Sequence, residues 1–201
     1  MKVGVPKELF EGEKRVAATP DSVKRLAKFG YSVIVESGAG AAAEYQDEAY
    51  RAAGATIGDA AMVWSCAVVA KVRPPSDAEV AQLTAGATLI SYIYPAHSKD
   101  LLDKLAARKV SVIAMDQVPR TTRAQKVDAL SSMGNLSGYR AVIEATQVLP
   151  RPLGGQSTAA GKIPPAKVLV IGAGVAGLAA VGTARALGAI VRAFDTRPVV
   201  K

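Results

Sequence analysis

The stretch KVLVIGAGVAGL, residues 167–178, decides how the second half of the chain folds. It starts as a continuous apolar strand and runs directly into the pattern G-x-G-x-x-G. A helix-like segment follows to Leu187, Gly188 ends it, and a second apolar run over residues 189–194 stops at Asp195. This order of strand, glycine turn, helix, strand and terminal acid predicts a βαβ unit that binds a dinucleotide.

Each glycine of the pattern has its own expected task. Gly172 permits the tight turn, Gly174 lets backbone amides approach a diphosphate without a Cβ in the way, and Gly177 lets the helix pack closely on the strand. The start of the helix then faces the phosphates with unpaired N–H groups and a partial positive charge. A bare G-x-G-x-x-G can also be a glycine-rich packing turn, so the prediction depends on the ordered elements around it.

The acid at the end of the second strand indicates which dinucleotide is preferred. Asp195 lies 21 residues beyond Gly174, which suits an acceptor for the two ribose hydroxyls of an adenosine. Its charge would repel a 2′-phosphate and therefore favours NAD over NADP. Two arginines, Arg192 and Arg197, flank the acid, so the acid alone does not decide the preference.

Short apolar runs alternate with helix-like segments through the first half of the chain. Helix starts are indicated by Thr19 before Pro20 and by Ser76 ahead of Glu79. The expected strands cover residues 3–5, 32–35, 67–69, 88–93 and 110–114. The expected helices cover residues 20–29, 44–53, 76–83 and 98–108. Alternation of this kind predicts a mostly parallel sheet covered by helices on both faces.

We expect an α/β chain of two domains. A flavodoxin-like or Rossmann-like parallel-sheet domain covers residues 1–125, and a long helix at 126–149 connects it to the first βαβ unit of a Rossmann NAD-binding domain at 150–201. Residues 150–165 are rich in Pro, Gly and small polar residues and are expected to form a loop. A full dinucleotide fold has about six strands. The nicotinamide half is therefore expected on a longer protein or on another chain.

The composition of the 201-residue chain excludes several classes of protein. With 50% hydrophobic and 21% charged residues, it is not a disordered chain, and its longest apolar run is too short for a bilayer crossing of ~20 residues. One cysteine and one histidine form neither a metal cluster nor an internal disulfide, and no signal peptide is recognised, so a reducing cytoplasm is expected. The net charge of +8 is scattered and aromatic residues make up only 5%, so no nucleic-acid partner is expected.

Five motifs occur in order along the chain: GVPKE at 4–8, EKRVA at 13–17, KVRPP at 71–75, RTTRAQKVDALSS at 120–132 and FDTRP at 194–198. With the glycine turn, they make the sequence resemble the NAD-binding alpha subunit of the proton-translocating NAD(P) transhydrogenases. That family is related to alanine dehydrogenase. The resemblance covers the whole chain and implies direct hydride transfer from NADH to NADP on a separate component.

The resemblance also implies which residues surround the nicotinamide, in a cleft between the first domain and the dinucleotide domain. Arg120 is expected to hold the carboxamide, and Gln125 to reach toward the partner nucleotide. Asp128 with Ser131 is expected to fix these two side chains. In the alternative interpretation, Arg120 and Arg123 are solvated charges, Gln125 is a helix cap, and Asp128 and Ser131 are ordinary first-turn residues.

Cofactors and partners follow from the same resemblance. NAD(H) is the expected cofactor, with NADP(H) on the partner component. The expected partners are a second alpha subunit in a homodimer, the NADP-binding beta component, and transmembrane segments that carry the protons. The chain would not insert into the membrane but lie peripherally on its inner, cytoplasmic face. The residues expected to bind NAD(H) are Gly172, Gly174, Val175, Ala176, Gly177, Asp195, Thr196 and Arg197.

Two other functions stay open. An alanine dehydrogenase would use Arg15 and Lys71 for its substrate, but its catalytic histidine aligns with Tyr94, and His97 is expected to be a surface residue at a helix start. Arg15 could instead pair with Glu11 on a surface loop. The third possibility is a truncated nucleotide-binding module without catalytic activity.

Overall fold

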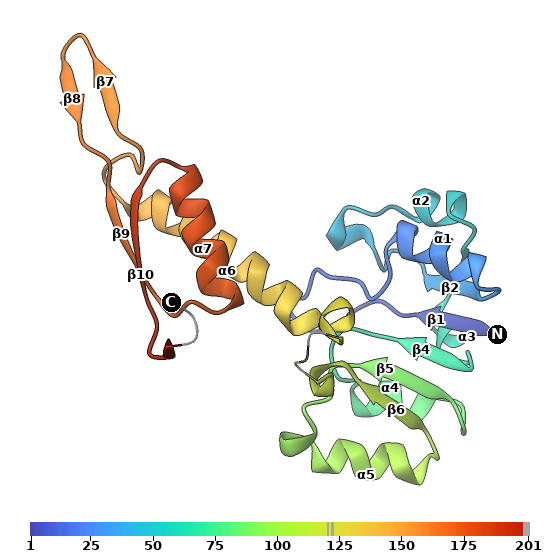
Figure 1. Cartoon of the computed structure of the whole chain (residues 1–201). Coiled ribbons are helices and arrows are strands. Elements are labelled where there is room, and N and C mark those ends of the chain that lie inside the picture. The colour runs from blue at the N-terminus through green and yellow to red at the C-terminus, as the bar shows by residue number, and fades with distance from the viewer. Residues whose placement is uncertain (120, 122, 199–201) are drawn as a thin grey trace. The chain divides into compact units, whose positions relative to one another are not determined.

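The computed structural model describes residues 1–119, 121 and 123–198. The chain forms two compact units, Met1–Val118 and Pro119–Lys201 (Figure 1). The long helix that was expected to connect two domains belongs to the second unit.

Six parallel strands form the sheet of the first unit. They are β1 (Lys2–Val5), β2 (Ser32–Glu36), β3 (Thr56–Gly58), β4 (Val68–Ala70), β5 (Thr88–Ser91) and β6 (Ser111–Ala114). Their order is β3-β2-β1-β4-β5-β6, so the strand order reverses between β1 and β4. This arrangement confirms the expected Rossmann-like parallel sheet. The short strand β3 was not predicted, because only one of its three residues, Ile57, has a large apolar side chain.

The helices of the first unit begin at recognisable caps. Thr19 accepts the N–H of Ser22 ahead of α1, and Ser76 and Glu79 form a reciprocal capping box ahead of α4. The α-helices are α1 (Pro20–Lys28), α2 (Asp47–Ala52), α3 (Ala60–Trp64), α4 (Asp77–Gln82) and α5 (Lys99–Ala107). The 3₁₀ helices are η1 (Ala41–Ala43), η2 (Pro95–His97) and η3 (Met115–Gln117). Helix α3 was not predicted, and the helix expected over 44–53 is the shorter α2.

Strand β2 shows how both faces of this sheet are buried. Val33 and Val35 join a core cluster with Val23 of α1, whereas Ile34 packs with Val63 of α3. Successive residues of a strand point to opposite faces. Helices α1 and α3 therefore cover opposite faces of the sheet, as the alternating sequence predicts.

The second unit contains the predicted βαβ unit. Its elements are η4 (Gln125–Val127), α6 (Ala129–Val148), β7 (Gln156–Thr158), β8 (Gly161–Ile163), β9 (Lys167–Ile171), α7 (Val175–Ala186) and β10 (Ile190–Phe194). Strands β9 and β10 pair in parallel, with Lys167 opposite Ile190 and Ile171 opposite Phe194. Helix α6 packs along α7.

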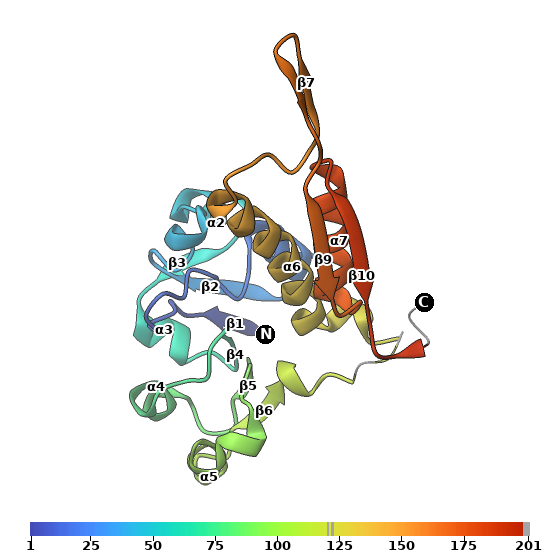
Figure 2. The same cartoon turned by 90° about the vertical axis from the view of Figure 1, so that its left-hand side faces the viewer.

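A hairpin replaces part of the loop expected over 150–165. Strands β7 and β8 pair antiparallel, and every residue of both strands is exposed (Figure 2). The sequence did not indicate this hairpin because strands with two exposed polar faces lack the apolar alternation that marks a half-buried strand.

No helix in the described part of the chain has the length and apolar character that a bilayer crossing requires.

Candidate functional site

The three glycines of the turn between β9 and α7 meet different structural demands. Gly172 has φ +101°, a conformation that favours glycine, and its N–H donates to the Phe194 carbonyl at 2.7 Å. A Cβ on Gly177 would lie 1.7 Å from the Gly172 carbonyl oxygen. The turn and its close packing against the helix therefore need glycine at both positions.

Gly174 meets neither demand. Its φ of −77° suits any residue, and a Cβ there would come no closer than 3.9 Å to another group, the Arg197 guanidinium. Gly174 is also the N-cap of α7. The first N–H groups of this helix, from Val175 onward, have no acceptor within the helix. The missing side chain leaves space in front of these donors, which suits the approach of a diphosphate.

Asp195 is fixed beside the same turn. Its Oδ2 accepts the Ala173 N–H at 2.7 Å, and Arg197 binds both carboxylate oxygens with its guanidinium at 2.9 Å. The hydrogen bonds from the Arg197 side chain, followed by the Ala173 N–H, hold the pKa of Asp195 well below its usual range. The structure thus brings the predicted turn, acid and arginine together. Thr196 lies between the last two and is exposed.

A second contact fixes the start of α7 from the side of α6. A Cβ on Gly138 would lie 1.9 Å from the Ala176 carbonyl oxygen, so only glycine allows the two helices to come this close. One turn earlier on α6, Gly134 lies opposite Val175 with an ordinary spacing of 4.0 Å. Helix α6 therefore supports the first turn of α7.

The residues expected around the nicotinamide lie at the beginning of α6. Asp128 is its N-cap: its carboxylate accepts the Ser131 N–H at 3.0 Å and the Ser131 hydroxyl at 2.5 Å. Gln125 is exposed at the start of η4 and does not cap a helix, because the N-cap of η4 is Ala124. Arg120 lies outside the described residues. The buried Asp128 carboxylate therefore fixes the start of α6, and the exposed Gln125 amide precedes Asp128 in the chain by three residues.

These features fit a dinucleotide on chemical grounds. The turn supplies backbone donors and open space for a diphosphate, and the acid at the end of β10 supplies acceptors for a ribose diol. The described residues contain no group of three His, Cys, Asp or Glu side chains placed to hold a metal ion.

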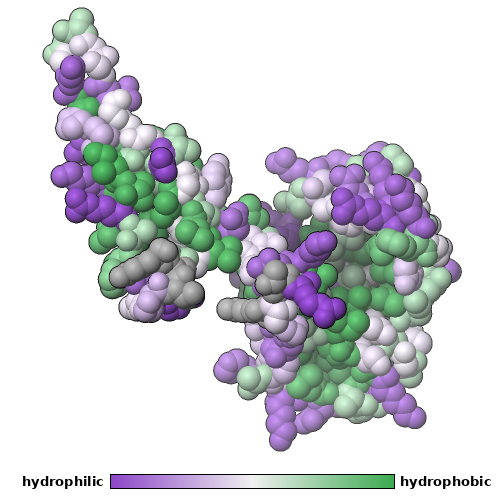
Figure 3. Space-filling model, in the orientation of Figure 1, coloured by the Kyte–Doolittle hydropathy of each residue, from purple (hydrophilic) through white to green (hydrophobic). Residues whose placement is uncertain are grey.

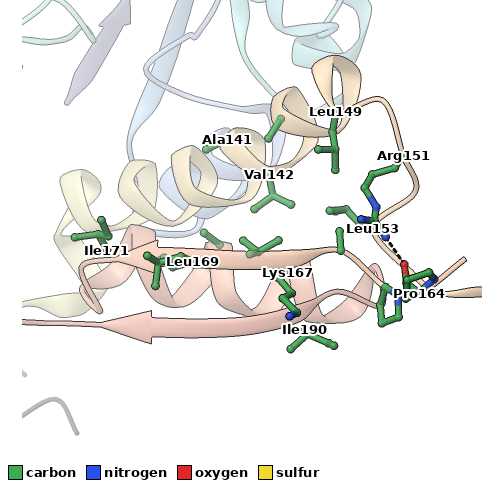
Figure 4. A pocket seen from close by; sticks show the side chains of 16 residues that line it. Ala141, Val142, Leu149, Arg151, Leu153, Pro164, Lys167, Leu169, Ile171 and Ile190 are labelled. Atoms are coloured by element: carbon green, nitrogen blue, oxygen red, sulfur yellow. Dashed lines mark hydrogen bonds between the residues drawn. The ribbon is translucent and has the colours of Figure 1, made fainter.

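A groove of about 980 Å³ lies between α6 and β9 in the second unit. Figure 4 shows Val142, Leu149 and Leu169 along it, with Arg151 donating to the Pro164 carbonyl at one end. Its lining is largely aliphatic. It has the character of a packing face, and few polar groups converge on it to orient a ligand.

The cations of the first unit that could hold a metabolite are paired with carboxylates. The Lys71 ammonium lies 3.0 Å from Glu8 and 3.1 Å from Glu79, and all three side chains are buried. Arg15 pairs with Glu13 at 2.7 Å, and not with Glu11 as in the alternative interpretation. The hydrogen bond from Arg15 lowers the pKa of Glu13 to about 2.

Tyr94 and His97 lie at the two ends of η2, beyond β5. Tyr94 has φ 54° and stacks on Tyr92, with ring centroids 6.1 Å apart. Asp116 holds this loop by accepting the N–H groups of Ile93 and Tyr94 at 2.8 and 3.1 Å. His97 is exposed, as expected for a surface residue.

The sequence did not lead us to predict the close helix contact at Gly138 or the ion pair between Asp195 and Arg197. Glycines four residues apart in a helix share one face, so Gly134 and Gly138 could have indicated a close helix contact. The sequence alone does not indicate which arginine pairs with Asp195, because the side chains of Arg192 and Arg197 are both long enough to reach it.

Comparison with known proteins gives consistent results for both halves. The family model "Alanine dehydrogenase/PNT, N-terminal domain" matches residues 4–137, and the corresponding C-terminal domain model matches residues 141–201. The NAD(P) transhydrogenase subunit alpha of Haemophilus influenzae is 57% identical over the whole chain, which spans 39% of that subunit.

Two solved structures are similar over the whole chain. The transhydrogenase from Sinorhizobium meliloti matches with a TM-score of 0.97 and 44% identity, and the chain covers 58% of it. An L-alanine dehydrogenase matches with a TM-score of 0.85 and 31% identity, and the chain covers 56% of it. The chain therefore spans little more than half the length of these structures.

Proposed function

This chain belongs to the alanine dehydrogenase/PNT family, and from that premise we propose that it is the NAD(H)-binding part of a proton-translocating NAD(P) transhydrogenase. In this role, it holds NADH by the turn between β9 and α7 and presents the nicotinamide to NADP(H) on a partner component. The similarity to transhydrogenase subunit alpha supports this function over that of its alanine dehydrogenase relatives.

The observation that carries the proposal is that neither the backbone conformation nor the packing requires a glycine at position 174. Gly172 and Gly177 are glycine for reasons of backbone conformation and packing, but the fold gives no such reason at Gly174. Its missing side chain keeps open a position from which an anion can reach the N–H groups at the start of α7. A diphosphate is the anion that this geometry suits best in a β-turn-α-β unit.

The remaining residues orient the cofactor. Asp195 accepts hydrogen bonds from the ribose, and the capping pair of Asp128 and Ser131 fixes the chain segment that carries Gln125. The bound nicotinamide supplies the hydride. Direct transfer needs reacting carbons ~3–3.5 Å apart in aligned geometry, so the task of Arg120 and Gln125 is to hold rings in place. Their amide and guanidinium groups donate hydrogen bonds without having to titrate.

The proposed partners follow from the names of the relatives. The Haemophilus influenzae relative is named a subunit alpha, and the name of the Rhodospirillum rubrum relative describes it as one portion of such a subunit. We propose that this chain works with an NADP-binding beta component and with transmembrane segments, as a homodimer on the inner face of the cell membrane.

The proposal is tested by replacing Gln125 with Asn in the assembled complex. The shorter amide no longer reaches the partner nucleotide, so the two rings are held less well in line. Single-turnover hydride transfer should therefore slow by a factor of roughly ten or more, because the rate depends steeply on the alignment of the reacting groups. NADH affinity should change less than about twofold, because the diphosphate and ribose contacts are intact. Equal losses in rate and affinity would instead assign Gln125 a structural role.

Alanine-dependent NADH formation by the complete protein tests the rival function. Arg15 and Lys71 would have to bind the substrate, but Glu13, Glu8 and Glu79 already pair with these two cations. We expect no alanine-dependent rate above background. A substantial rate would defeat the transhydrogenase proposal.

A further inference from the structure

The carboxylate of Asp195 is already saturated by donors from the protein. Its Oδ1 accepts the N–H and the Nε–H of Arg197 at 2.8 and 2.9 Å. Its Oδ2 accepts the Ala173 N–H at 2.7 Å and Nη2 of Arg197 at 2.9 Å. A carboxylate offers about four acceptor positions. A ribose diol needs two of them, so it binds only if some of these protein donors leave.

The Arg197 guanidinium is the donor that can leave most easily. Its side chain is 59% exposed, and exposed ion pairs contribute little stability. The Ala173 N–H, in contrast, belongs to the turn that Gly172 and Gly177 hold in shape. Arg197 is also the group nearest to the open side of Gly174, 3.9 Å from a Cβ placed there. When it releases the acid, its charge stays within reach of the phosphates.

We infer that Arg197 is a specificity-determining residue that weakens the discrimination between NAD(H) and NADP(H) at this site. The inference rests on the proposed function, because it concerns the same nucleotide. An unpaired Asp195 binds a ribose diol freely and repels a 2′-phosphate. With Arg197 present, the diol competes against the guanidinium for the same oxygens. The guanidinium also offers a bidentate fork to a 2′-phosphate. The first effect weakens the binding of NAD(H), and the second strengthens the binding of NADP(H).

Replacing Arg197 by Ala in the full chain tests this inference, with Arg192→Ala as the matched control. Arg192 is exposed on β10, and its removal changes the net charge equally. Affinities for NAD⁺ and NADP⁺ are measured by NMR titration, which reads weak binding. We expect Arg197→Ala to tighten NAD⁺ binding about two- to fivefold and to weaken NADP⁺ binding about tenfold. Arg192→Ala should change both affinities by a similar, smaller factor.

A second measurement needs no nucleotide. In the free chain, Arg197→Ala should raise the pKa of the Asp195 carboxyl toward its ordinary value, whereas Arg192→Ala should not. An unchanged pKa would show that the contact does not exist. A raised pKa with an unchanged ratio of NAD⁺ to NADP⁺ affinity would overturn the role in specificity. If the unmodified chain binds neither nucleotide although the pKa rises in the variant, the proposed function itself fails.

Discussion

Strand β9 is more apolar than β2, but only β2 is covered on both faces. In β2, residues 33–35 are buried between α1 and α3. In β9, Leu169 and Ile171 are 64% and 78% exposed, and hydrophobic residues form much of the surface of the second unit seen in Figure 3. The apolar content of a strand therefore indicates how much apolar surface the strand can bury, but not whether other elements of the structure cover that surface.

This difference predicts that the same substitution has unequal effects in the two sheets. Leu89 of β5 is fully buried in a cluster with Trp64, whereas Leu169 is largely exposed. Leu89→Ala should lower the free energy of unfolding by about 3 kcal/mol, because it removes buried surface and leaves a cavity. Leu169→Ala should lower it by less than about 0.5 kcal/mol.

Urea unfolding measures both effects. The single tryptophan, Trp64, reports on the first unit, and amide hydrogen exchange of α7 reports on the second. If the Leu169→Ala chain lost as much stability as the Leu89→Ala chain, the face of β9 would have to be covered in solution.

Helix packing gives a second contrast, this time within the second unit. Gly138→Ala forces a Cβ to within 1.9 Å of the Ala176 carbonyl oxygen, so α6 and α7 must separate. We expect a loss of about 2 kcal/mol from this overpacking. Gly134→Ala places its Cβ 4.0 Å from Val175 and should stabilise α6 by about 0.5–1 kcal/mol. Protection of α7 amides against hydrogen exchange measures both changes, and equal protection in the two variants would contradict the close contact.

A third expected loss of stability, smaller than those at Leu89 and Gly138, concerns a charge in the first unit. Glu13 is 4% exposed, pairs with Arg15 and Arg73, and has its pKa lowered to about 2 from 4.5. Because the folded-state pKa is the lower one, the carboxylate stabilises the fold above pH 4.5, and this contribution is lost as the pH falls toward 2. Glu13→Gln should therefore lower the free energy of unfolding by about 1–2 kcal/mol at about pH 6.

The difference between the two proteins should shrink as the solution is acidified toward about pH 2. Urea unfolding followed by Trp64 fluorescence at a series of pH values measures it. A difference that stays constant with pH would show that the Glu13 carboxylate is not the source of the effect.

Local patterns predicted most of the parts that position the site. The β9 strand, the glycine turn, α7 and β10 each follow from nearby residues, and so do the caps at Thr19 and Ser76. The approach of Gly138 to Ala176 and the fork of Arg197 on Asp195 depend on how elements or side chains meet in space. No spacing rule fixes such contacts. The role of Gln125 stays a prediction, because geometry alone does not show what the amide reaches.

The most direct test of the account is an NMR titration of the ¹⁵N-labelled chain with NAD⁺, compared with Gly174→Ala and, as control, Gly182→Ala. A Cβ meets nothing within 4 Å at Gly182 and only Arg197 at Gly174, so both variants should keep the fold. We predict that NAD⁺ shifts the amide signals of residues 172–177 and of Asp195 in the unmodified chain and in Gly182→Ala. These shifts should be lost in Gly174→Ala. Equal shifts in Gly174→Ala, or none in the unmodified chain, would contradict the claim that this turn binds the diphosphate.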